Sequence, residues 1–123
     1  MRKSYKLVTA IAVVTLAVSA LAGCSSSSID AKKYDAIVDV RTALEFSQGH
    51  LQGAINVDVE DPNFIANIES LAKSGNYVVY CHTGRRAGIA IDEMKQDGFT
   101  GDLVNAGGYQ DASNATGLPI VAN

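Results

Sequence analysis

The residues with the clearest potential for chemistry form one short run behind an apolar segment. Residues 77–80 are Tyr-Val-Val-Tyr, and Cys81 follows them directly. The next six residues are His82, Thr83, Gly84, Arg85, Arg86 and Ala87. A cysteine reacts as its thiolate, and nearby arginines and backbone N–H groups stabilise that negative charge. These residues therefore predict a site for an anionic thiolate and an anionic substrate.

The secondary structure expected around Cys81 brings a helix N-terminus close to its sulfur. Tyr77–Cys81 is a short run of β-branched and aromatic residues, which is typical of a buried strand. Apolar residues then recur at helical spacing until Gly98, which predicts a helix over Ala87–Asp97. Open α/β sheets place ligand sites at the carboxyl ends of their strands, and a helix N-terminus favours anions. Cys81 is thus expected at such a site.

Four segments of the chain are expected to form strands. They are short apolar runs bounded by turn residues, at 35–40, 55–57, 77–81 and 102–105. Because helices are expected between them, the strands should form a parallel sheet through right-handed crossovers, with helices on both faces. The sequence therefore predicts an α/β fold with a small parallel sheet of four to five strands.

The expected helices have recognisable ends in the first half of the chain. Thr42 and Glu45 have the spacing of a capping box, and Gly49 follows within two turns, so this helix is short. Asp61 and Pro62 are expected as the N-cap and the first residue of the next helix. Both helices follow expected strands, in agreement with the alternating pattern.

The segment after the last expected strand is less regular. Residues 106–109 are expected to form a turn, a short helical stretch follows to Asn114, and residues 117–120 are expected to form a loose strap. The chain has no internal repeat and no sign of a second domain. Residues 34–123 are therefore expected to form one small domain.

The N-terminal residues have the pattern of a secretory signal. Three basic residues precede an uncharged apolar run over Leu7–Ala22, which is short for a membrane span of about 20 residues. Residues 21–24 are Leu-Ala-Gly-Cys, which resembles the lipobox of bacterial lipoproteins. That resemblance implies cleavage before Cys24 and a lipid on its thiol. An uncleaved anchor or an ordinary signal peptide is the alternative.

The expected mature protein is lipid-anchored in the cell envelope, outside the cytoplasm. Residues 1–23 form the signal peptide, residues 24–33 form a flexible tether that begins with serines, and residues 34–123 form the domain. In a bacterium with two membranes, Ser25 after the lipidated cysteine implies sorting to the outer membrane, within the periplasm. A bacterium with one membrane would hold the protein on its outer face.

Charge and cysteine usage exclude several other classes of protein. Residues 1–23 carry three of the ten Lys and Arg residues and none of the thirteen Asp and Glu residues, which leaves a net charge of about −6. No basic stripe is present, so no nucleic-acid partner is expected, and the acidic surface and lipid anchor suit a monomer. Two distant histidines and one free thiol predict neither a metal site nor a cofactor. Cys81 is then a reactive thiol or a small buried apolar residue, and the loop after it favours reactivity.

Four segments, in this order, resemble the motifs of the rhodanese-like sulfurtransferases. They are Asp39-Val40-Arg41, Glu45-Phe46 with Gly49-His50-Leu51-Gln52-Gly53-Ala54-Ile55-Asn56, Cys81-x-x-Gly84-x-Arg86-Ala87, and Gly107-Gly108-Tyr109. The resemblance runs along nearly the whole domain. It is strongest to small exported single-domain rhodaneses of the phage-shock protein E type, and it implies a three-layer rhodanese-like fold.

The resemblance also implies sulfur transfer in two steps. The Cys81 thiolate would take the outer sulfur of thiosulfate or a similar small anion, release sulfite and hold a persulfide. A thiol, or cyanide in an assay, would then accept that sulfur. In this scheme Arg86 is catalytic with Cys81, because it holds the shape of the loop and supplies a positive electrostatic field from the helix start. The substrate contacts come from His82, Thr83, Gly84, Arg85, Ala87 and Arg41.

Three polar residues near the expected site have structural alternatives. Arg41 either attracts the anion or pairs with Glu45 on the surface, where such pairs contribute little. Asp39 is expected to fix Arg41 or a loop N–H group. His50 is expected to make a structural hydrogen bond between its turn and the sheet rather than to bind a ligand.

Other functions compete with sulfur transfer. Phosphatases and arsenate reductases of related folds use Cys-x5-Arg loops, whereas four residues separate Cys81 from Arg86, and the shorter loop suits a sulfur atom better than a tetrahedral phosphate. A non-catalytic binding module is a second alternative, although Cys81, Gly84 and Arg86 are all retained. A disulfide oxidoreductase would need a second, resolving cysteine, which the sequence lacks beside Cys81.

Overall fold

A four-stranded parallel sheet lies at the centre of the computed structural model, which describes residues 28–122. The strand order is β3-β1-β4-β5, and every neighbouring pair is parallel. The strands are β1 (Ala36–Asp39), β3 (Ile55–Asn56), β4 (Tyr77–Cys81) and β5 (Leu103–Gly108). The expected α/β fold with a small parallel sheet is therefore confirmed, with four strands in that sheet.

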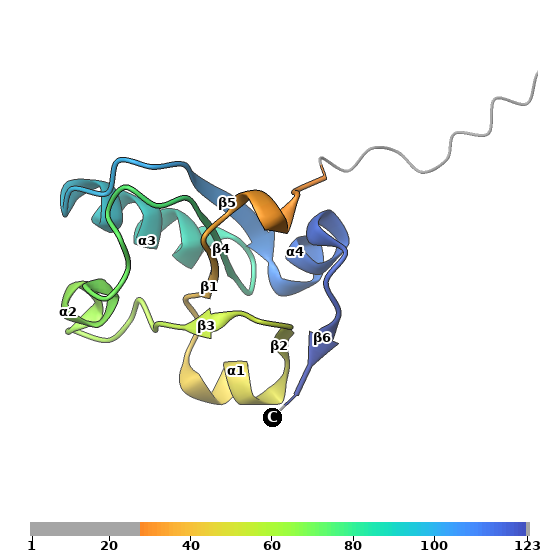
Figure 1. Cartoon of the computed structure of the whole chain (residues 1–123). Helices are drawn as coiled ribbons and strands as arrows, with labels where there is room; N and C mark the ends of the chain where they lie inside the picture. Colours follow the sequence, from red (N-terminus) through yellow and green to blue (C-terminus); the bar gives the residue numbers. More distant parts are fainter. Residues whose placement is uncertain (1–27, 123) are drawn as a thin grey trace, which may run out of the picture.

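Helices cover both faces of the sheet, as expected (Figure 1). One face packs against α2 (Phe64–Ile68) and α3 (Arg85–Gln96). The other packs against α4 (Tyr109–Thr116) and a short 3-10 helix, η1 (Ala31–Lys33). A further helix, α1 (Ala43–Gln48), follows β1 at the carboxyl edge of the sheet. The arrangement has three layers.

Residues of β4 alternate between the two apolar layers. Tyr77, Val79 and Cys81 pack on the side of α2 and α3, whereas Val78 and Tyr80 pack on the side of α4. All five are buried, and each large apolar side chain of this kind contributes about 1.5–3 kcal/mol on burial. Burial on both faces explains the uninterrupted apolar run of this strand, and it fixes the backbone that carries Cys81.

The C-terminal segment is more regular than its sequence predicts. Strand β5 continues through Gly108 and α4 follows at once, so the turn expected at 106–109 is wrong. Residues 117–120 are not a loose strap, because β6 (Ile120–Val121) pairs antiparallel with β2 (His50–Leu51). These two strands have only two residues each and lie far apart in the chain, so no local sequence pattern predicts their pairing.

Two helices begin at other residues than predicted. Helix α2 begins at Phe64 rather than Pro62, because the side chain of Asp61 accepts the N–H of Asn63 at 2.8 Å and stabilises a turn before the helix. Helix α3 begins at Arg85 rather than Ala87. The second difference matters for the site, since it places both arginines in the first turn of the helix.

The expected tether overlaps with the fold. The N–H of Ile29 donates to the carbonyl of Ala115 at 2.8 Å, and η1 follows, so residues 29–33 pack on the domain rather than forming a tether. The signal peptide at 1–23, the lipidation of Cys24 and the start of the tether lie outside the described residues. Within residues 28–122, no helix has both the length and the apolar character needed to span a bilayer.

Candidate active site

The loop after β4, residues 81–86, turns back onto the sulfur of Cys81, and we call it the cysteine loop. Sγ of Cys81 accepts a hydrogen bond from the N–H of Gly84 at 2.9 Å, and Cys81 is fully buried. Gly84 has a φ of 98°, a conformation that favours glycine, and directly precedes α3. No side chain in the described part of the chain caps α3, so its first N–H groups point toward the loop without an intrahelical acceptor.

Arg86 links the cysteine loop to α1 through two parallel hydrogen bonds. Its Nη1 donates to Oε2 of Glu45 at 2.8 Å, and its Nη2 donates to Oε1 at 3.0 Å. The predicted capping box of Thr42 and Glu45 is confirmed, so Glu45 is held from both sides. The hydrogen bond from Arg86 is the main reason why the pKa of Glu45 falls to about 2, and Glu45 in turn raises the pKa of Arg86.

The Glu45–Arg86 pair predicts a measurable dependence of stability on pH. Because the pKa of Glu45 drops from 4.5 to about 2 on folding, its stabilising contribution is present above pH 4.5 and disappears as the pH falls toward 2. Wild-type protein should therefore lose unfolding free energy more steeply over this range than Glu45→Gln, which keeps a capping side chain without the charge. Denaturant unfolding at several pH values measures this, and equal slopes for both proteins would contradict it.

Arg41 is buried with Asp39 rather than exposed. Its Nη2 lies 2.6 Å from Oδ2 of Asp39 and also donates to the carbonyl of Gly49 at 2.6 Å. Burial alone would lower the pKa of Arg41, but the hydrogen bond and charge of Asp39 outweigh burial and raise it. The expected fixing of Arg41 by Asp39 is confirmed. The alternative surface pair with Glu45 is wrong, because Glu45 binds Arg86 instead.

The end of β5 supports the cysteine loop from the neighbouring strand. Nδ2 of Asn105 donates to the carbonyl of Gly84 at 2.9 Å, and its Oδ1 accepts the N–H of Gly107 at 2.9 Å. Gly108 is in register with Cys81, and a Cβ atom at Gly108 would overlap the carbonyl oxygen of His82. These residues therefore position the loop, although they contribute no side chain to the sulfur.

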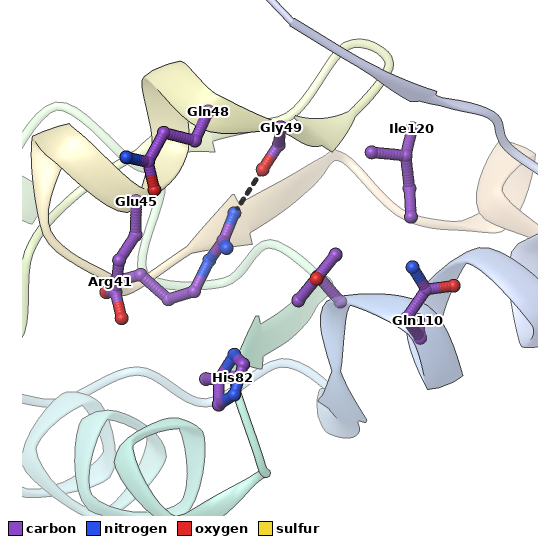
Figure 2. A pocket seen from close by; sticks show the side chains of 8 residues that line it. Arg41, Glu45, Gln48, Gly49, His82, Gln110 and Ile120 are labelled. Atoms are coloured by element: carbon purple, nitrogen blue, oxygen red, sulfur yellow. Dashed lines mark hydrogen bonds between the residues drawn. The ribbon is translucent and has the colours of Figure 1, made fainter.

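A pocket of about 420 Å³ lies beside the cysteine loop, and we call it the side pocket (Figure 2). In Figure 2, Arg41 lies on one side of the pocket and Gln110 on the other, with His82 below them. The ring of His82 stacks on Tyr109 at a centroid distance of 5.8 Å. The pocket is lined by Arg41, Glu45, Gln48, Gly49, His82, Tyr109, Gln110 and Ile120. Cys81 is not among its lining residues.

The structure brings only some of the predicted substrate contacts together. Arg41 and His82 line the side pocket, whereas Thr83 and Arg85 are exposed on the loop and at the start of α3. The side chain of Ala87 is buried in the core with α2, so only its backbone N–H remains as a candidate substrate contact. Nδ1 of His50 donates to the carbonyl of Phe46 at 2.8 Å, so this histidine makes a structural hydrogen bond as expected, but to α1 rather than to the sheet.

Sequence reasoning missed several residues around the site. The sequence predicts Glu45 as part of a helix cap or as a surface partner of Arg41, whereas in the structure it binds Arg86. It predicts Tyr109 as part of a turn, whereas in the structure Tyr109 lines the side pocket. Gln48 and Gln110 carry no recognisable pattern. Asn105 could have been found from its place two residues before the paired glycines. Among residues 28–122 no group of three or more His, Cys, Asp or Glu side chains could hold a metal ion.

Comparisons with known proteins find similar sequences and a similar fold. The sequence model of the rhodanese-like domain matches residues 25–115. The chain is 39% identical over 95 residues to thiosulfate sulfurtransferase 16, chloroplastic, of Arabidopsis thaliana, covering 69% of this chain and 78% of that protein. It is 34% identical over 74 residues to thiosulfate sulfurtransferase PspE of Escherichia coli strain K12, covering 60% and 70%. A solved structure described as a rhodanese with anions from E. coli gives a TM-score of 0.58 at 32% identity, covering 72% of this chain and 98% of that chain.

Proposed function

The chain belongs to the rhodanese-like domain family, and we propose that it is a sulfurtransferase that carries a sulfane sulfur on Cys81. The observation that carries the proposal is the hydrogen bond from the Gly84 N–H to Sγ of Cys81, at the uncapped start of α3. Backbone N–H groups and a helix dipole stabilise an anionic sulfur at this position. The names of the two curated relatives, both thiosulfate sulfurtransferases, support the same reaction class.

In the first step, the Cys81 thiolate attacks the outer sulfur of thiosulfate. A bond forms between Sγ and that sulfur, the bond from the outer to the central sulfur of thiosulfate breaks, and its electron pair leaves with sulfite. The N–H groups at the start of α3 are placed to stabilise the negative charge on the transferring and leaving atoms. Cys81 then holds a persulfide, whose outer sulfur is the atom to be transferred.

In the second step, a thiol or cyanide takes the outer sulfur and restores the Cys81 thiolate. Arg86 serves as a positioning residue here, because both of its terminal nitrogens are engaged by Glu45. That engagement also argues against a phosphatase. A phosphatase would need this guanidinium to bind the phosphate, and the cysteine loop has four residues rather than five between cysteine and arginine.

The N-terminal sequence supports a location for this reaction. We propose that residues 1–23 direct export and that a lipid on Cys24 anchors the domain outside the cytoplasm, as their lipobox-like pattern indicates. The sulfur donor would then be a small anion present outside the cytoplasm. Metabolic labelling with a radioactive fatty acid is expected to label the protein, and loss of the label in Cys24→Ala would support the anchor.

A direct comparison of two reactions tests the proposed function. The purified protein should form thiocyanate from thiosulfate and cyanide, whereas hydrolysis of p-nitrophenyl phosphate should stay at the level of a protein-free blank. Both assays use the same preparation, so a poorly folded sample would fail in both. Phosphate-ester hydrolysis at a rate that rivals thiocyanate formation would overturn the proposal in favour of the phosphatase alternative.

A further inference from the structure

Each of the two charged side chains that line the side pocket is neutralised by an oppositely charged neighbour. The Arg41 guanidinium pairs with Asp39, and the Glu45 carboxylate pairs with Arg86. A second small dianion would therefore find no uncompensated positive charge in the pocket. The free N–H groups that favour an anion lie at the start of α3 instead. The pocket thus differs chemically from the site expected for thiosulfate.

Arg41 nevertheless offers hydrogen-bond donors to a ligand in this pocket. The residue is only 3% exposed, and its hydrogen bonds use Nε and Nη2. Within residues 28–122, Nη1 has no hydrogen-bond acceptor, and it keeps some accessible surface because it is not among the fully buried unsatisfied atoms. Arg41 itself lines the side pocket. A donor held this rigidly suits a carbonyl or carboxylate oxygen of a bound molecule.

The remaining walls also suit an organic molecule with amide groups. Gln48 and Gln110 are exposed carboxamides from α1 and α4, and each both donates and accepts hydrogen bonds. The stacked rings of His82 and Tyr109 add a flat wall. The volume of about 420 Å³ lies in the range of pockets for drug-sized ligands and is far larger than thiosulfate or cyanide needs.

The side pocket lies next to the strand end that carries the reacting sulfur, because two of its lining residues directly follow paired strand residues. Cys81 and Gly108 are neighbours at the ends of β4 and β5, and the residues that follow these strands, His82 and Tyr109, line the pocket. A persulfide adds a second sulfur about 2 Å beyond Sγ at the end of the strand. A molecule in the pocket therefore lies at the same edge of the sheet as the sulfur that must be transferred.

We propose that the side pocket is the acceptor subsite, and that it selects an organic thiol bearing amide or carboxylate groups. The inference rests on the sulfur transfer proposed above. The acceptor thiol first passes its proton to the outer sulfur of the Cys81 persulfide anion left by the first step. The resulting acceptor thiolate attacks that sulfur, and a new S–S bond forms. The S–S bond to Cys81 breaks, its electron pair stays on Sγ as the thiolate, and the acceptor leaves as a hydropersulfide that keeps the proton. Oxygen atoms of the acceptor bind Nη1 of Arg41 and the two carboxamides.

Acceptor kinetics on the full chain test this subsite. The double variant Gln48→Ala/Gln110→Ala should raise the KM for glutathione, a peptide thiol, by about tenfold with little change in kcat, since each lost hydrogen bond is modest. The KM for 2-mercaptoethanol, a thiol without carbonyl groups, and the kcat/KM for cyanide should change less than twofold. Gln96→Ala, the same substitution on the exposed face of α3, is the matched control and should leave all three acceptors unaffected.

The results separate the subsite from the proposed function. If wild-type protein transfers no sulfur to cyanide, the proposed function fails. If cyanide turnover is normal but the KM for glutathione is unchanged in the double variant, only the subsite fails. An equal loss of kcat/KM with glutathione, 2-mercaptoethanol and cyanide in the double variant would also overturn the subsite. A rise in the KM for thiosulfate alone would do the same. Titration with S-methylglutathione, which cannot react, should show weaker binding to the double variant than to wild type.

Discussion

Replacement of Cys81 by serine is expected to lower thiosulfate–cyanide turnover by at least about 10³-fold, because the reaction then lacks its nucleophile. A serine hydroxyl is not ionised near neutral pH and forms no persulfide. The substitution is close to isosteric, and the N–H of Gly84 that donates to Sγ at 2.9 Å can donate to the new oxygen instead. Thiocyanate formation under saturating thiosulfate measures the loss.

The comparison needs evidence that the variant is folded. Cys81 is fully buried at the end of β4, so circular dichroism and thermal unfolding should accompany the kinetics. A folded Cys81→Ser protein that keeps more than a tenth of wild-type turnover would contradict the role of Cys81. A folded, inactive variant would show that the loss comes from the chemistry rather than from the scaffold.

Gly108→Ala is expected to reduce kcat/KM for thiosulfate by about 10²-fold, although residue 108 contributes no functional group. The backbone at Gly108 has a φ of −78°, which any residue adopts, so the conformation itself is not strained. The new Cβ would instead overlap the carbonyl oxygen of His82, and the backbone of the cysteine loop must move. Such a shift displaces the donors around the sulfur, which should appear as a loss in kcat/KM.

Gly88→Ala provides the matched control for this substitution. Its Cβ would meet Nδ2 of Asn105 at 3.6 Å, an ordinary contact, and alanine favours a helix interior over glycine by about 1 kcal/mol. This variant should keep activity within about twofold of wild type and unfold at a slightly higher temperature. If Gly108→Ala retains wild-type kinetics while Gly88→Ala does not, β5 does not position the loop as we describe.

The sequence predicted well those parts of the structure that depend on local patterns. The buried strand ending in Cys81, the capping box of Thr42 and Glu45, and the parallel α/β sheet all follow from periodicity and spacing within short segments. The start of α3 was misjudged by two residues, because the arginines at its first turn carry no apolar periodicity. Glycine at residue 84 marked the turn itself correctly.

The sequence could not predict the contacts between distant segments. The β2–β6 pair joins residues about seventy positions apart. No partner was predicted for Arg86, which binds Glu45, and Arg41 was given two possible partners, of which the structure has Asp39. Several carboxylates were available to each arginine, and local spacing does not decide among them. The side pocket depends on four separate segments meeting, so its two glutamines carried no signal until the fold was known.

The most direct test of the central proposal is the intact mass of the protein after treatment with thiosulfate. The protein is expected to gain the mass of one sulfur atom per chain, to lose it on addition of cyanide with release of one thiocyanate, and to show no gain in Cys81→Ser. Retention of the original mass by folded wild-type protein, or an equal gain in the Cys81→Ser variant, would contradict the persulfide and with it the proposed sulfur transfer.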